Sequence, residues 1–218
     1  MGAAAAEVAR EAGWRLKSLL RCRRFYSVDK LMLLYKAHIL TFIESRTPAL
    51  HHAAPSVLEC IDRVQRRFLR EVGIFEVETF QRFKLAPLSI RRDISMFGLM
   101  YRIAHGLAPK CLCDLFPKKL EARLPSLRGE RHDLQFQDFM MLGGHANILR
   151  RSCFGLATVW NMLPMKVVRA KSVKICQRDI QSAVLSFCLE NNARCEWRDF
   201  FSSNARTMPM YVLQKLFQ

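Results

Sequence analysis

Hydrophobic residues recur along most of this chain at intervals of three and four positions, which is the period of an α-helix. The clearest example is the segment 56–72, which is followed by Gly73. Its regularly spaced apolar residues are Val57, Ile61, Val64 and Phe68. A glycine just past the last apolar turn is a common helix end. The pattern therefore predicts an amphipathic helix over 56–72 that buries one face.

The same period predicts helices before and after this one. The expected ranges are 3–22, 27–45, 56–72, 76–85, 89–104, 109–116, 152–160 and 172–190, with two shorter helices beyond. Residues suited to N-caps stand at four of the starts, namely Ser27, Ser89, Ser152 and Ser172. After Trp160, we expect Asn161 to adopt the left-handed conformation, and Pro164 prevents the helix from continuing. Segment 134–142 has no decisive period.

A polar, basic stretch at 118–133 interrupts the helical pattern and contains Pro125, Ser126 and Gly129. We predict that it is a linker between a helical domain at 1–117 and a helical region at 134–218. The expected fold is mainly α: an irregular helical bundle followed by a smaller helical C-terminal region.

Charge narrows the class of partner. Lys and Arg number 35 against 19 Asp and Glu, which gives a net charge of +16 in 218 residues. Such an excess favours polyanionic partners, above all nucleic acid. There is no run of about 18 apolar residues that would span a bilayer, so no membrane insertion is expected, although binding to a membrane surface stays an alternative.

The eight cysteines do not indicate a secreted, disulfide-bonded protein, because the first residues form an alanine-rich helix start and not a signal peptide. We expect an intracellular protein, nuclear or cytoplasmic, with reduced thiols.

Cys111 and Cys113 are separated by one residue, which is poor spacing for a zinc site with His132 or His145. We expect no metal and no cofactor.

Four arginines on the helix at 56–72 are the first candidate binding site. They are Arg63, Arg66, Arg67 and Arg70, spaced i, i+3, i+4 and i+7. This spacing places the guanidinium groups in one stripe, opposite the apolar face. The stripe has two interpretations: it grips phosphates, or it is an ordinary solvated helix face.

Further basic residues are candidates of the same kind. Arg91 and Arg92 lie in the first turn of their helix, where the helix dipole disfavours cations, so each needs an anionic partner. That partner is either nucleic acid or an acidic side chain of the same fold. The predicted linker offers the remaining candidates, Lys118, Lys119, Arg123, Arg128 and Arg131. They would follow a nucleic acid as an arm, or merely favour solubility.

Four blocks in a fixed order resemble the region after the polymerase palm in LINE-type, jockey-like retrotransposon reverse transcriptases. They are Leu34-Tyr35-Lys36-Ala37, the Val64-Gln65-Arg66-Arg67 core of 61–70, the stretch 85–93 followed by 101–106, and Trp160-Asn161-Met162-Leu163-Pro164. The resemblance covers roughly 10–185. It implies thumb-like helices and a tail that contact template and primer through the backbone, beside a separate polymerase core.

The chain departs from that family where chemistry is concerned. Polymerisation needs acidic side chains that hold two metal ions, and the family presents them as adjacent aspartates. No Asp-Asp pair occurs in this sequence. We therefore expect a non-catalytic fragment or remnant that binds RNA or DNA backbone without sequence preference. The hydrophobic faces that would contact the absent palm should be partly exposed, so we also expect self-association. Two alternatives stand beside this reading: a helical protein-interaction module with incidental charge, and a decayed reading frame without function.

Overall fold

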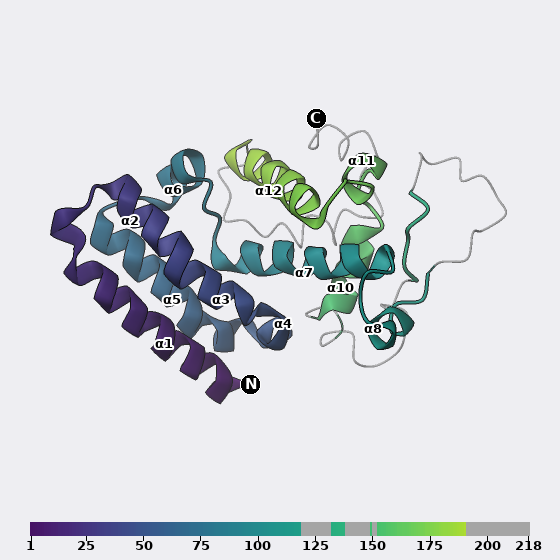
Figure 1. Ribbon diagram of the computed structural model, residues 1–218, viewed down its shortest axis with the longest axis horizontal. Coiled ribbons are helices and arrows are strands. Elements are labelled where there is room, and N and C mark those ends of the chain that lie inside the picture. The colour runs from purple at the N-terminus through teal and green to yellow at the C-terminus, as the bar shows by residue number, and fades with distance from the viewer. Residues whose placement is uncertain (119–131, 138–148, 150–151, 191–218) are drawn as a thin grey trace. The chain divides into compact units, whose positions relative to one another are not determined.

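The computed structural model describes residues 1–118, 132–137, 149 and 152–190. These residues are mainly helical and form no strand, apart from an isolated antiparallel bridge between Lys118 and Phe136. The prediction of a mainly α fold is confirmed. The chain divides into two compact units, 1–92 and 93–218, which are described in turn (Figure 1).

The first unit is a bundle of helices. Its elements are α1 (Gly2–Arg21), the 3₁₀ turn η1 (Arg23–Phe25), α2 (Val28–Tyr35), the π-turn η2 (Lys36–Leu40), α3 (Thr41–Ser45), α4 (Thr47–Leu50), α5 (Pro55–Val72) and α6 (Glu76–Phe83). Figure 1 shows α1, the α2–α3 rod and α5 running beside one another, and α1 packs against both α5 and α2. The helices expected over 3–22, 56–72 and 76–85 are confirmed within one or two residues.

The core of this bundle lies where the apolar periodicity placed it. Ile61, Val64 and Phe68 of α5 are buried, and Leu16 faces them from α1 as part of the same cluster. Tyr35 stacks on Phe68 with ring centroids 4.2 Å apart and an interplanar angle of 8°. Burial of these side chains supplies most of the stability of such a bundle, at roughly 1.5–3 kcal/mol for each fully buried large apolar side chain.

The helix expected over 27–45 is present but interrupted. Residues 36–40 form a π-turn between α2 and α3, so that segment is a helical rod with a wide turn in its middle. The Lys36 carbonyl accepts the backbone N–H of Thr41, five residues on, and also accepts the Thr41 hydroxyl at 2.9 Å. Ser27 occupies the expected N-cap position but makes no side-chain cap bond.

Helix α7 (Leu88–Ala104) begins in the first unit, and its residues from 93 onward belong to the second. The further helices of the second unit are α8 (Lys110–Asp114), α10 (Cys153–Trp160), α11 (Met165–Val168) and α12 (Val173–Glu190). The hydroxyls of Ser152 and Ser172 accept from the backbone amides of Phe154 and Ile175, as predicted for helix caps. The two shorter helices expected after 190 lie outside the described residues.

The second unit is organised around Trp160, which is fully buried. Its indole N–H donates to the Leu134 carbonyl at 2.8 Å, and its own carbonyl lies 2.9 Å from His132 Nε2. The ring of Phe136 packs beside the indole at a centroid distance of 6.1 Å. Segment 132–137, whose conformation the sequence did not predict, is thus extended chain that covers the end of α10.

Asn161 corrects one prediction. Its backbone is right-handed, with φ −63° and ψ −15°, and not left-handed. Its side-chain amide explains the difference: Oδ1 accepts from the Phe136 amide and Nδ2 donates to the Phe136 carbonyl, both at 2.8 Å. Asn161 therefore pairs with the backbone of segment 132–137 instead of reversing the helix end.

The two compact units meet between residues 92 and 93, and the linker predicted at 118–133 stays a prediction. Residues before that linker contact residues after it: the Tyr101 hydroxyl donates to the Ala170 carbonyl at 2.6 Å, and the Phe116 ring stacks on Phe154 at 4.8 Å. Gly98 lets Gln177 of α12 come so close that an added Cβ would lie 2.5 Å from its Nε2. Because of such contacts, residues 93–117 belong with the C-terminal helices. Most of the predicted linker lies outside the described residues.

Candidate nucleic-acid interface

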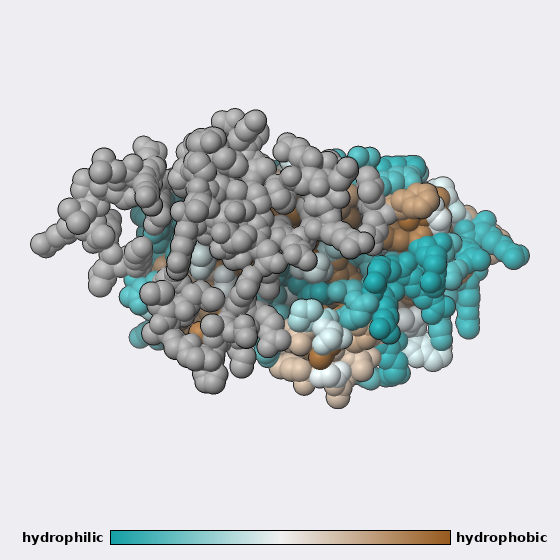
Figure 2. All heavy atoms as spheres, turned by 180° about the vertical axis from the view of Figure 1, so that it is seen from behind, coloured by the Kyte–Doolittle hydropathy of each residue, from teal (hydrophilic) through white to brown (hydrophobic). Residues whose placement is uncertain are grey.

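The four arginines of α5 all lie on the surface of the first unit. Arg63, Arg66, Arg67 and Arg70 are exposed, while Phe68 on the same helix is fully buried. From Arg63 to Arg70 the stripe spans seven residue steps, or about 10 Å along the helix axis at 1.5 Å per residue. From behind, the visible surface shows a broad area of hydrophilic residues beside smaller hydrophobic ones (Figure 2). The geometric part of the prediction is therefore met.

One carboxylate reduces the charge at the N-terminal end of this stripe. Glu59 accepts a hydrogen bond from Arg66 and lies 3.6 Å from Arg63 Nε. The Arg66 hydrogen bond and the positive charge of both arginines hold the pKa of the Glu59 carboxyl below its usual value. Within the described residues, Arg67 and Arg70 have no ion-pair partner. The uncompensated charge thus lies toward the C-terminal end of α5.

The C-terminal ends of α1 and α5 are joined by an ion pair. Arg23, just past the end of α1, lies 2.6 Å from Glu71 in the last turn of α5. Arg21 and Arg24 flank Arg23 and are exposed. Cations are favourable at helix C-termini because the carbonyl ends of the helices carry partial negative charge. The junction therefore adds basic side chains to the same end of the bundle.

Arg91 and Arg92 have acidic partners inside the first unit, which is one of the two alternatives that the sequence allowed. Arg91 Nε donates to Glu44 of α3. Arg92 forms a bidentate pair with Asp62 of α5, with N to O distances of 2.6 and 3.0 Å, and only 8% of its side chain is exposed. These two arginines hold the beginning of α7, residues 88–92, to the other helices of the first unit and are not part of a free basic surface.

The hydroxyl of Tyr35 lies among these ion pairs. Burial raises its pKa strongly, and the charges of Glu44 and Asp62 act in the same direction while Arg91 opposes them. Burial, assisted by the charge of Arg91, lowers the pKa of the neighbouring Lys36, whose ammonium donates to the Phe83 carbonyl. In the part of the chain that the structure describes, the Tyr35 hydroxyl has no hydrogen-bond partner. The contacts that the described residues make in this cluster are ring stacking and charge compensation.

Of the basic residues in the predicted linker, the structure describes only Lys118. Lys118 is exposed, and its backbone pairs with Phe136. Lys119, Arg123, Arg128 and Arg131 lie outside the described residues. They stay predictions and add nothing to the interface built here.

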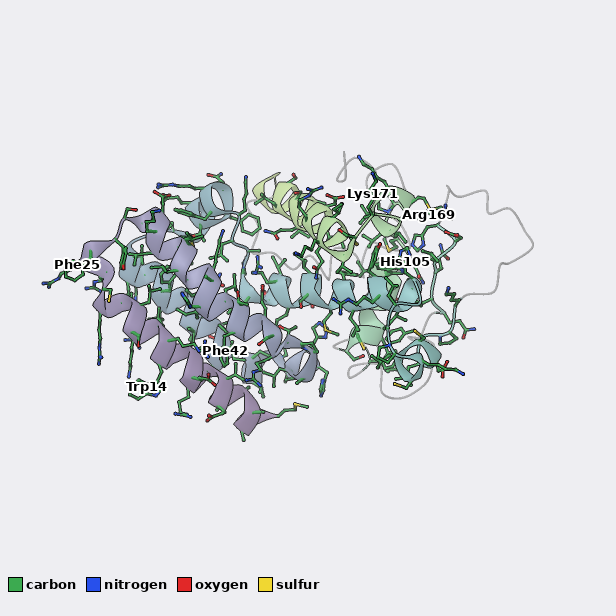
Figure 3. The ribbon with its side chains drawn as sticks, viewed as in Figure 1. Trp14, Phe25, Phe42, His105, Arg169 and Lys171 are labelled. Atoms are coloured by element: carbon green, nitrogen blue, oxygen red, sulfur yellow. The ribbon has the colours of Figure 1, made fainter. Side chains whose placement is uncertain are left out.

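Sequence reasoning overlooked the exposed aromatic residues on the first unit. Trp14 is 56% exposed and Phe25 is 83% exposed. Figure 3 shows Trp14 on the outer side of α1 and Phe25 at the end where α1 turns toward α2. A signal was available: Arg10, Trp14, Lys17 and Arg21 recur at i, i+4, i+7 and i+11, which is one face of a helix opposite the buried Ala12 and Leu16.

The described residues contain no cluster of side chains suited to a metal ion. Their free cysteines include Cys22, Cys60, Cys111, Cys113, Cys153 and Cys176. Burial raises the pKa of the Cys153 thiol and, with help from Asp179, raises that of Cys176 to about 12. Both are therefore thiols and not thiolates near neutral pH, so neither is an activated nucleophile.

Among the described helices, none combines the length and the apolar character needed to cross a membrane. In comparisons with known proteins, no family model, no curated protein and no solved structure matches this chain. A proposal about function therefore rests on the arrangement of charged side chains on the first unit.

Proposed function

We propose that this protein binds RNA or DNA without sequence preference, through contacts of the first unit with phosphates. The observation that supports this most directly is the exposed arginine stripe of α5, two of whose members have no acidic partner among the described residues. Arginine suits phosphate because its planar fork of N–H donors matches the anion and keeps its charge at any physiological pH.

The net charge of +16 points in the same direction. Contacts of this kind position a protein on the backbone and do not read bases, so the proposed activity is not sequence-specific. A stripe of about 10 Å covers about three phosphate spacings, and therefore about four successive phosphates of one strand, given about 3.4 Å per phosphate along a B-form axis.

We further propose that the chain derives from the thumb and tail of a LINE-type reverse transcriptase and lacks catalytic activity of its own. Support comes from the four ordered sequence blocks and from the absence of an Asp-Asp pair in the sequence. One of those blocks contains Arg66 and Arg67, so the proposed evolutionary origin and the proposed binding role rest partly on the same residues. A separate polymerase core is the expected protein partner.

The test measures binding and its salt dependence. Purified protein is titrated into labelled single-stranded RNA and duplex DNA at several salt concentrations, beside a variant with Arg63, Arg66, Arg67 and Arg70 changed to Gln. We expect the slope of log K against log salt to become shallower by about 3, since each lost phosphate contact contributes 0.7–0.9. A matched control removes four exposed charges elsewhere through Lys30→Gln, Lys166→Gln, Lys174→Gln and Arg178→Gln.

Equal losses in both variants would mean that only net charge matters and that the stripe has no special role. No binding by the wild type at low salt would reject the function itself. A protein-interaction module would then be favoured, because an apolar interface weakens little with salt.

A further inference from the structure

We infer that the outer face of α1 and the turn that follows it bind single-stranded nucleic acid by stacking its bases on Trp14 and Phe25. This inference deepens the proposed function and rests on it: phosphate contacts hold the strand, and the two aromatic rings select unpaired bases. Bases in a duplex are already stacked on one another and offer no free face.

The two rings are exposed to a degree unusual for large aromatic side chains. Trp14 is 56% exposed in the middle of α1, and Phe25 is 83% exposed in the turn η1. Figure 3 shows both at the periphery of the bundle, on α1 and at its end. Neither ring supports the core, because the buried residues of α1 are Ala5, Ala12 and Leu16.

Cations alternate with these rings. The ammonium of Lys17 lies 5.0 Å from the centre of the Trp14 ring, and Arg21 follows one turn later on the same face. Arg24 stands next to Phe25 and is exposed. Among the described residues, none of these three cations has a carboxylate partner. Aromatic platforms combined with a basic track are the common design of proteins that bind single strands.

An anionic membrane surface is the competing partner for exposed aromatic and basic residues. A helix that lies in a membrane inserts a continuous apolar face. The apolar face of α1 is occupied, since Leu16 and Ala12 are buried against the bundle. What remains outside is two separate rings among cations, which suits a polyanion with flat bases better than a lipid layer.

The experiment uses the full-length protein and three probes: a single-stranded oligonucleotide, the same strand with abasic sites in place of its bases, and the corresponding duplex. The test variant is Trp14→Leu with Phe25→Leu, which keeps apolar side chains but removes both rings. The control is Phe75→Leu, because Phe75 is 80% exposed yet stands in a stretch with Glu76 and Glu78.

We expect the wild type to prefer the intact strand over the abasic strand and the duplex. The test variant should lose at least roughly 25-fold in affinity for the intact strand, since stacking on one aromatic ring contributes about 1–3 kcal/mol, or about 5- to 160-fold, and two rings are removed. Its affinity for the abasic strand and its salt slope should not change, and Phe75→Leu should leave all three affinities as they are.

Two outcomes would overturn the inference while leaving phosphate binding intact: equal affinity for all three probes, or an unchanged affinity of the test variant for the intact strand. Binding of the wild type to phosphatidylserine vesicles that the test variant loses, without any effect on the oligonucleotides, would assign the rings to a membrane surface instead. Failure of the wild type to bind any oligonucleotide would reject the proposed function together with the inference.

Discussion

Arg92 and Asp62 form a bidentate ion pair in which the two terminal guanidinium nitrogens of Arg92 donate to the two carboxylate oxygens of Asp62 at 2.6 and 3.0 Å. The pair joins Arg92, in the second turn of α7, to the middle of α5. Because only 8% of the Arg92 side chain is exposed, its guanidinium depends on Asp62 for charge compensation. Asp62 lies about 90° around the helix axis from the centre of the arginine stripe, so α5 carries the stripe and the partner of Arg92 on adjacent faces.

Removal of one member of this pair should destabilise the first unit. Asp62→Ala leaves a buried guanidinium without a partner, and we expect a loss of about 3 kcal/mol in the free energy of unfolding. Urea titration followed by far-ultraviolet circular dichroism measures it. Glu59→Ala on the same helix is the matched control, since Glu59 forms solvent-exposed pairs, which contribute little to stability. Similar small losses in both variants would contradict the structural role given to Arg92.

Asn161 should be similarly important in the second unit. Its amide makes two hydrogen bonds with the Phe136 backbone, so Asn161→Ala should cost about 2 kcal/mol, at about 1 kcal/mol for each bond. Thr158→Ala in the preceding turn removes a partly exposed side chain that forms no hydrogen bond within the described residues, and it should change stability by less than about 0.5 kcal/mol. Thermal unfolding of the two variants decides the point: equal midpoints would show that Asn161 contributes nothing at this corner.

His132 should make the second unit sensitive to mild acid. The ring is 2% exposed, and Nε2 must donate a proton to reach the Trp160 carbonyl at 2.9 Å. The other nitrogen, Nδ1, is buried and has no acceptor within the described residues, so a second proton is unfavourable. Burial accordingly lowers the pKa of His132, outweighing the hydrogen bond to Trp160 and the charge of Asp133.

The sign of the effect follows from proton uptake. Below the unfolded pKa of about 6.5, the unfolded chain binds a proton that the folded chain does not. Stability is therefore complete above that pH and is lost as the pH falls through it, by at most about 1.4 kcal/mol per pH unit. Unfolding free energies of wild type and His132→Gln between pH 7.5 and about 5 test this. The variant should show a flatter profile, whereas His52→Gln, at an exposed position, should follow the wild type.

The helices of this protein could be predicted from sequence because their apolar positions follow one period over three or more turns. The residues of α5 show this best, since the same pattern placed Phe68 in the core and Arg63 on the surface. Features that depend on contacts distant in sequence were not accessible. The bonds between Asn161 and Phe136 span 25 positions, and the Arg92 to Asp62 pair spans 30. The π-turn at 36–40 also escaped prediction, because an extra residue in one turn leaves the apolar pattern almost unchanged.

Gly73 and Gly13 allow a paired test of how α5 and α1 are built. Gly73 ends α5 with φ +74°, a conformation that costs other residues about 1–2 kcal/mol, so Gly73→Ala should lower the free energy of unfolding by about 1 kcal/mol. Gly13 lies inside α1, and an added Cβ there would meet nothing within 4 Å.

Gly13→Ala should therefore raise the free energy of unfolding by up to about 1 kcal/mol, because alanine loses less backbone entropy than glycine in a helix interior. The same substitution thus has opposite signs at two glycines of one bundle. Urea titrations of both variants against the wild type measure the difference. Destabilisation by Gly13→Ala would mean that α1 is not a regular helix at this position, and a neutral Gly73→Ala would mean that α5 does not end in the left-handed turn described.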